Sequence, residues 1–209
     1  MVNSSIRNVV FDLGGVLINT DLNRTVQHFK ALGVSGAEEM FSNPDFMTIY
    51  HQFECGAISD IEFRDRLRLL YPILSEASDQ QIDSAWNAML IDIPEYKLDL
   101  LLELRSHLIV YLLSNTNTIH WEWALENLFR YKGFTHEDFF EHEYLSFRLQ
   151  KCKPEESVFE FVLSDANIDA AETFFIDDKK ENTDAAEKLG MLTYTPKLNE
   201  DWSFLFNIE

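Results

Sequence analysis

The stretch Phe11-Asp-Leu-Gly-Gly-Val-Leu-Ile-Asn-Thr-Asp21 places a carboxylate directly behind an apolar run. The run that leads into it, Asn8–Phe11, is rich in Val and Phe, which is typical of a short buried strand. In open α/β sheets, ligands bind beyond the carboxyl ends of the strands. Asp12 therefore lies where a parallel strand would present it to a ligand.

Several later segments share the composition of this first run. They are Leu108–Leu113, His142–Leu145, Thr173–Ile176 and Leu192–Thr195. Amphipathic helical patterns fill most of the gaps, and alternation of apolar strands with helices predicts a parallel sheet that helices cover on both faces. We therefore expect an α/β fold with a doubly wound, Rossmann-like core.

The gap between Asp12 and Leu108 is much longer than one crossover helix requires. Its patterns predict helices and no strand; Ser59 and Glu62, for example, have the spacing of a capping box. Pro94 then suits the first turn of a helix that returns to the sheet. We predict an α/β core of residues 1–18 and 92–209 and an inserted α-helical cap of residues 19–91.

Charge and cysteine content restrict the partners and the compartment. A formal net charge of −19 over 209 residues repels nucleic acids and anionic lipid surfaces, so we expect neither a nucleic-acid nor a membrane partner. Cys55 and Cys152 are too few for a disulfide framework, so we expect reduced side chains. No apolar segment resembles a signal peptide or a bilayer span, which favours a cytoplasmic protein. The sequence indicates no oligomeric state.

Polar residues follow the other predicted strands as well. Ser114 ends one, Asp177 and Asp178 follow another, and Lys153 precedes a helix that Pro154 would begin. Each alone has an ordinary explanation as a helix cap, a turn residue or a solvated charge. Because the carboxyl ends of parallel strands meet at one edge, their common position favours a site instead. Carboxylates, a hydroxyl and an ammonium suit phosphoryl transfer with Mg²⁺ through an aspartyl-phosphate.

Four motifs in this order resemble those of the haloacid dehalogenase superfamily, in the branch that carries a helical cap after the first strand. They are Phe-Asp12-Leu-Gly-Gly-Val-Leu, Leu-Leu-Ser114-Asn115-Thr-Asn, Lys153-Pro154, and Phe-Phe-Ile-Asp177-Asp178 with Asn182 downstream. Any one of them would be a weak signal. Together they are a strong signal, and the resemblance extends over nearly the whole chain.

The resemblance implies a role for each motif residue. Asp12 would be the nucleophile and a Mg²⁺ ligand, with the Gly14 carbonyl as a further ligand. Asp178 would contact the metal directly, and Asp177 would act through water or Lys153. The Ser114 hydroxyl and the Asn115 amide would bind phosphate, which Lys153 would also stabilise together with Asp12.

The chain departs from the family at Gly14, where most phosphatases of the superfamily carry a second Asp that serves as general acid and base. Losing such an acid typically costs about 10²- to 10⁴-fold with a poor leaving group. Asp21 is a candidate substitute, although capping the first helix of the insert is the simpler explanation. Asn23 and Arg24 are candidate substrate contacts, as are Phe53 and Glu54.

We therefore predict a Mg²⁺-dependent phosphatase of small phosphomonoesters, such as sugar phosphates. The partner would be a small phosphorylated metabolite. Two alternatives stay open. The missing second acid would suit a 2-haloacid dehalogenase-type hydrolase, because halide leaves without a proton, although the adjacent Asp177 and Asp178 indicate a metal site that such an enzyme does not need. A catalytically weak binding or regulatory protein could also retain these motifs.

Overall fold

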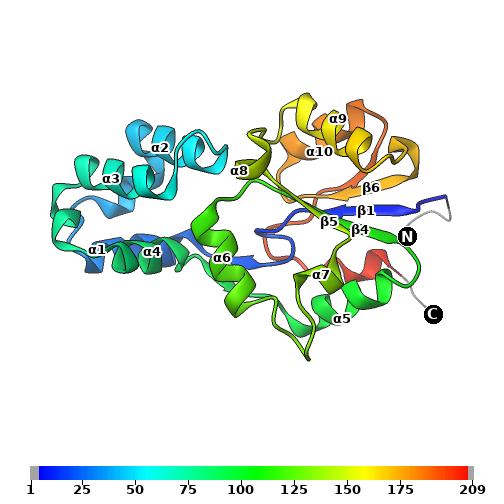
Figure 1. Ribbon diagram of the computed structural model, residues 1–209, viewed down its shortest axis with the longest axis horizontal. Coiled ribbons are helices and arrows are strands. Elements are labelled where there is room, and N and C mark those ends of the chain that lie inside the picture. The colour runs from blue at the N-terminus through cyan, green and yellow to red at the C-terminus, as the bar shows by residue number, and fades with distance from the viewer. Residues whose placement is uncertain (1–4, 207–209) are drawn as a thin grey trace.

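A computed structural model describes residues 5–206 of the chain. Its centre is a five-stranded sheet in the order β5-β4-β1-β6-β7, with every neighbouring pair parallel (Figure 1). The strands are β1 (Asn8–Phe11), β4 (Ile109–Ser114), β5 (His142–Leu145), β6 (Thr173–Ile176) and β7 (Leu192–Tyr194). The predicted doubly wound α/β fold is confirmed, and each predicted strand is found to within one residue.

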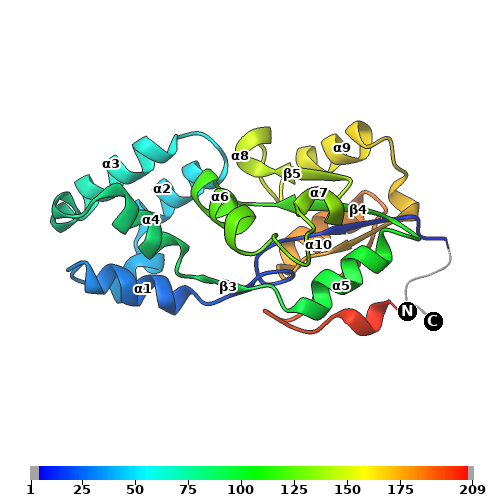
Figure 2. The same ribbon diagram turned by 60° about the horizontal axis from the view of Figure 1, so that its bottom comes forward.

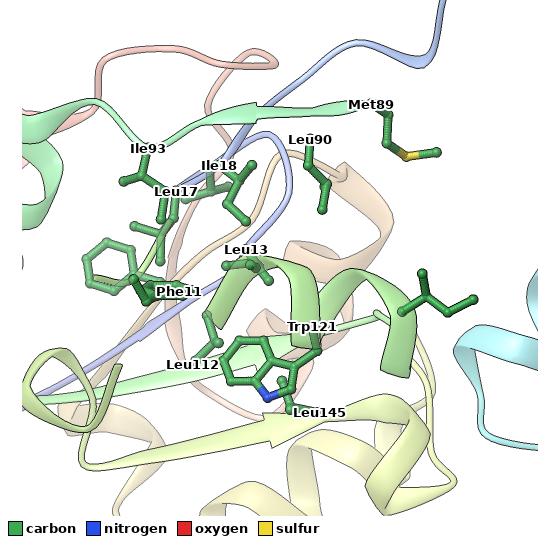
Figure 3. Packing of buried hydrophobic residues seen from close by; sticks show 14 of the residues in the cluster. Phe11, Leu13, Leu17, Ile18, Met89, Leu90, Ile93, Leu112, Trp121 and Leu145 are labelled. Atoms are coloured by element: carbon green, nitrogen blue, oxygen red, sulfur yellow. The ribbon is translucent and has the colours of Figure 1, made fainter. Parts of the chain in front are cut away.

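Helices cover both faces of the sheet because the strands carry apolar side chains on both faces. Along β1, Val9 and Phe11 face one side and Val10 faces the other. The Val10 side packs against α9 (Glu156–Asp165) and α10 (Lys180–Lys188). The opposite side packs against α5 (Glu95–Leu104), α6 (Thr118–Asn127) and α7 (His136–Phe139), and Figure 3 shows Phe11, Leu112 and Trp121 together on that side.

The long insertion forms a separate helical layer beyond one end of the sheet (Figures 1 and 2). It contains α1 (Leu22–Ala31), α2 (Pro44–Glu54), α3 (Asp60–Leu70) and α4 (Asp79–Asn87), with short 3₁₀ helices at Ala37–Ser42 and Pro72–Glu76. Ser59 and Glu62 form the predicted capping box at the start of α3. Buried aromatic rings fill the interior of this layer; Phe53, for example, stacks on Phe63 with centroids 4.3 Å apart.

The expectation of no strand in the insertion is wrong at its two ends. β2 (Asn19–Thr20) and β3 (Leu90–Asp92) pair antiparallel where the chain leaves the core and returns to it. Segments of two or three residues are too short to show a period in the sequence. These two strands lie at the ends of residues 19–91, the range that the sequence predicts for the cap. We call this range the cap below; the division into domains itself stays a prediction.

The prediction of reduced cysteines is also wrong. A disulfide joins Cys55, directly after α2, to Cys152, which follows α8 (Ser146–Leu149). The two residues are 97 positions apart in sequence, and only the seating of the cap on the core brings them together. The cysteine argument for a reducing compartment therefore loses its basis. Separately, within residues 5–206 no helix combines the length and apolar character needed to span a bilayer.

The disulfide is one of three contacts that fix the end of α2 on the core. Ser146 donates its hydroxyl to the backbone carbonyl of Glu54, at 2.5 Å. Gly56 has φ of +68°, and a Cβ there would lie 2.3 Å from the carbonyl oxygen of Phe147. Glycine is therefore required for the approach of the two backbones. These contacts place the segment 54–56 against the sheet edge that carries the site.

Reducing the disulfide should lower the free energy of unfolding by about 2–4 kcal/mol, because the bond restricts a long loop in the unfolded chain. Denaturant titration with and without dithiothreitol measures the difference. The double variant Cys55→Ala/Cys152→Ala should respond to denaturant identically in both conditions. Two free thiols in the intact mass of the non-reduced protein would contradict the pairing.

Candidate active site

A cavity of about 260 Å³ opens at the carboxyl ends of the strands, between the sheet and the cap. Asp12, Ser114, Lys153 and Asp178 line it from the core, and Tyr50 and Glu54 line it from α2. Apolar side chains form another part of the wall, among them Leu13, Ile18, Met89 and Leu90, whose grouping Figure 3 shows. Residues predicted from separate strands thus converge on one cavity that the cap completes.

Lys153 holds the centre of the site. Its Nζ donates to Asp12 Oδ1 at 2.8 Å, to Asp177 Oδ2 at 2.6 Å and to the carbonyl oxygen of Leu113 at 2.7 Å. An ammonium has three donors, so each is used. Lys153 is 4% exposed, and a buried ammonium is costly unless it is paired in this way. The arrangement fixes Asp12 at the end of β1 relative to the end of β6.

Asn115 positions the backbone of Lys153. Its side-chain amide donates to the Lys153 carbonyl at 2.8 Å, and its side-chain oxygen accepts from the Lys153 backbone N–H at 2.9 Å. The sequence assigned a function only to the backbone amide of Asn115, so this role of the side chain was missed. Ser114, immediately before it, is buried at the end of β4 and lines the cavity.

The two adjacent acids have different surroundings. Asp177 is fully buried and accepts hydrogen bonds on both oxygens, from Lys153, from the Asn182 amide at 2.9 Å and from the Lys179 backbone N–H at 2.8 Å. Asp178 lines the cavity, and its buried Oδ1 has no hydrogen-bond partner within residues 5–206. A buried, unpaired carboxylate oxygen carries a desolvation cost that a cation would remove.

The site holds more negative than positive charge. One ligand oxygen from each of Asp12, Asp177 and Asp178 can be chosen so that all three lie within 4.8 Å of one another. Burial raises the pKa of Asp12 to about 7 although Lys153 opposes the shift, and the charges of the other two carboxylates add to it. Burial, followed by the charge of Asp177, also raises the pKa of Asp178. Such a cluster suits a divalent cation with oxygen ligands.

The two glycines after Asp12 differ in what surrounds them. Gly15 has φ of +79°, and a Cβ there would lie 2.8 Å from both Asp178 Oδ2 and Leu198 Cδ1. At Gly14 a Cβ would have only Thr20 Cγ2 within 4 Å, at 3.7 Å. The crowding at Gly15 explains its identity, whereas Gly14 leaves space for a side chain that this chain lacks.

The candidate contacts at the start of α1 lie away from this centre. Asp21 caps α1, accepting a hydrogen bond from the Asn23 backbone N–H at 2.9 Å. Asn23 and Arg24 are exposed, and none of the three lines the cavity. Of the two later candidates, Phe53 is buried inside the cap and Glu54 lines the cavity. Tyr50, His120 and Lys179 also line it. The position of His120 shortly after Ser114 is a signal for it in the sequence, whereas no motif marks Tyr50 or Lys179.

Known proteins resemble this chain over most of its length. A family model of haloacid dehalogenase-like hydrolases matches residues 6–190. The chain is 34% identical to the D-ribitol-5-phosphate phosphatase of Bacteroides thetaiotaomicron over 197 residues, which are 94% of this chain and 95% of that protein.

Solved structures extend the comparison. A haloacid dehalogenase family enzyme of Bacteroides thetaiotaomicron, solved in complex with magnesium and inorganic phosphate, is 51% identical and superposes with a TM-score of 0.92, covering 97% of this chain and all of that one. An L-2-haloacid dehalogenase is 16% identical, with a TM-score of 0.62 over 92% of this chain and 86% of its own. At that identity the likeness concerns the fold alone.

Asp12→Asn should stabilise the protein at pH 8 in the absence of divalent cations. The pKa of Asp12 in the folded protein lies above its ordinary value of 3.8, so ionisation of Asp12 opposes folding. This cost in the free energy of unfolding is absent below about pH 4 and complete above about pH 7. The gain at pH 8 should be on the order of 2–4 kcal/mol. Urea unfolding in EDTA at pH 8 and pH 4 measures it.

Asp45→Asn, which changes an exposed carboxylate of the cap, is the matched control and should shift unfolding by less than about 1 kcal/mol at both pH values. A loss of stability in Asp12→Asn at pH 8 would show that the ion pair with Lys153 outweighs the burial of charge.

Gly15→Ala should destabilise the protein more than Gly36→Ala does. Both positions have positive φ, but at Gly36 a Cβ would meet nothing within 4 Å, so that variant bears only the conformational cost of about 1 kcal/mol. Crowding against Asp178 and Leu198 should add about 1–3 kcal/mol at Gly15. Urea unfolding of both variants tests this, and equal effects would remove the steric explanation.

Proposed function

The chain belongs to the haloacid dehalogenase-like hydrolases, and we propose that it is a Mg²⁺-dependent phosphatase that hydrolyses a small sugar phosphate or sugar-alcohol phosphate through an aspartyl-phosphate on Asp12. One observation carries the proposal. Lys153 pairs with Asp12 and Asp177, which leaves Asp178 as the acid with an unpaired oxygen at the cavity. In one cavity these residues would supply a nucleophile, a cation for the phosphate and a carboxylate for a metal.

The donor set fits Mg²⁺, which prefers carboxylate and carbonyl oxygens. Asp12 and Asp178 would hold the ion directly, with the backbone carbonyl of Gly14 as a further ligand, and Asp177 would act through Lys153. When bound, the ion supplies positive charge that allows an anionic carboxylate to approach an anionic phosphate. Magnesium in the 51% identical relative supports this assignment.

The reaction would proceed in two steps. Asp12 attacks phosphorus and the alcohol leaves; water then attacks the aspartyl-phosphate and regenerates Asp12. Lys153 holds Asp12 in place and, together with the Ser114 hydroxyl and the Asn115 backbone N–H, would bind the phosphate oxygens. Because the site is buried, these charged groups interact more strongly with the phosphoryl group than they would in water.

The cavity supports a small polyol as the leaving group. Its volume of about 260 Å³ limits the substrate, while Thr20, Tyr50 and Glu54 offer polar contacts between the apolar side chains. The 34% identical relative acts on D-ribitol 5-phosphate, a substrate of this size and chemistry. The absence of nucleic-acid and membrane partners and a cytoplasmic location stay predictions.

The dehalogenase alternative has weaker support. Its likeness extends to the fold, whereas the acidic pair at the end of β6 and the phosphatase relative both favour phosphate chemistry. The regulatory alternative requires that Asp12 have no chemical role.

The native chain should release phosphate from D-ribitol 5-phosphate or a related sugar phosphate with Mg²⁺, and EDTA should abolish the activity. Asp12→Asn should lower kcat/KM by at least about 10³-fold, because the nucleophile is removed. Asp45→Asn serves as the control and should retain the native rate. Colorimetric phosphate release over a panel of phosphomonoesters measures all three, and halide release from 2-haloacids without phosphate release from any ester would support the dehalogenase instead.

A further inference from the structure

The proposed function leaves one proton without a donor. An alcohol that leaves from a phosphomonoester must be protonated, and Gly14 offers no side chain for that purpose. Among the titratable groups that line the cavity, Asp12, Lys153 and Asp178 already have roles. His120 is unsuitable, because burial lowers its pKa to about 4 and its ring stacks on Trp86 with centroids 4.9 Å apart.

We propose that Glu54 of the cap is the general acid that protonates the leaving oxygen and the general base that activates water afterwards. This inference rests on the proposed phosphatase function. It assigns a catalytic proton to a residue of the inserted helical layer in place of the missing side chain at Gly14.

The geometry of Glu54 suits this role. It is half-buried in the wall of the cavity, on the cap side that faces Asp12 and Ser114. Tyr50, one helical turn earlier on α2, donates its hydroxyl to Glu54 Oε1 at 2.6 Å. Oε2 has no hydrogen bond to any residue in the range 5–206, which leaves one carboxyl oxygen for a proton and a substrate.

Contacts with the core also fix the position of Glu54. The hydroxyl of Ser146 binds its backbone carbonyl, the next residue forms the disulfide to Cys152, and Gly56 packs on the Phe147 backbone. Cys152 is the neighbour of Lys153, so these contacts connect Glu54 to the residue that positions the nucleophile. A general acid requires such fixed placement relative to the reacting atoms.

The electrostatic surroundings keep Glu54 available as an acid near neutral pH. Burial raises its pKa to about 7, and the Asp12 carboxylate acts in the same direction. The hydrogen bond from Tyr50 and the charges of Lys179 and Lys153 oppose the shift without cancelling it. Burial raises the pKa of Tyr50 well above its ordinary value, so Tyr50 remains a hydrogen-bond donor.

The proton balance closes over the two steps. As Asp12 forms its bond to phosphorus, the bond to the leaving oxygen breaks and the Glu54 proton moves to that oxygen, so that a neutral alcohol departs. Water then bonds to phosphorus while Glu54 takes one of its protons and the bond to Asp12 breaks. Inorganic phosphate, ionised Asp12 and protonated Glu54 are restored.

The test compares two leaving groups in Glu54→Gln. For D-ribitol 5-phosphate, whose alkoxide is strongly basic, kcat/KM should fall by about 10²- to 10⁴-fold. For p-nitrophenyl phosphate, whose phenolate leaves without a proton, kcat/KM should stay within about threefold of native, since this parameter reports the formation of the phosphoenzyme. Glu76→Gln, at an exposed glutamate of the cap, should leave both values unchanged.

Equal losses on both esters, or none on either, would overturn the role of Glu54. A wild-type chain inactive on every phosphomonoester of the panel would instead overturn the proposed function. The pH profile is an independent readout: the native kcat/KM for the alkyl ester should fall as pH rises through the pKa of Glu54, and this limb should disappear in Glu54→Gln. If Glu54→Gln does not fold, Glu54→Asp, which keeps the acid on a shorter side chain, replaces it. The fall in kcat/KM must then again be confined to the alkyl ester.

Discussion

The site depends on one buried interaction, the Lys153 ammonium between the carboxylates of Asp12 and Asp177. It joins the ends of β1 and β6 through a residue that follows β5 and α8, so it can form only when the sheet has its observed order. A buried ion pair costs desolvation and gives little net stability. Here it fixes the position of Asp12, the proposed nucleophile, and pairs with Asp177, so that Asp178 is the acid of the adjacent pair that we propose for the metal.

In the proposed mechanism the cap supplies a catalytic group and also covers the cavity. Its helices have their own aromatic core, but the end of α2 is fixed on the sheet side by a hydrogen bond, a disulfide and a close backbone approach. Tyr50 and Glu54 consequently line the cavity from the cap side, and Asp12, the proposed nucleophile, lines it from the core. Under the proposed mechanism, residues of the core bind the phosphate, and residues of the cap surround the leaving group.

The sequence predicted the sheet and its acidic edge because both follow local rules. Short runs of Val, Ile and Phe identify β1 and β6. A polar residue directly after such a run lies at the carboxyl end of the strand, and these ends meet at one edge of a parallel sheet. The Cys55–Cys152 bond and the approach of Glu54 to Asp12 depend on how the cap is seated, which no local pattern encodes. β2 and β3 are too short to have a period. Asp21 shows the opposite error, because its proximity to Asp12 in sequence suggested a role that its capping of α1 explains.

A crystal structure with Mg²⁺ and beryllium fluoride would test the central arrangement most directly, because this fluoride forms a stable mimic of an aspartyl-phosphate. We expect beryllium bonded to a carboxylate oxygen of Asp12, Mg²⁺ coordinated by Asp12 and Asp178, and Lys153 still between Asp12 and Asp177. Mg²⁺ bound directly by Asp177, or the fluoride on any group other than Asp12, would contradict it.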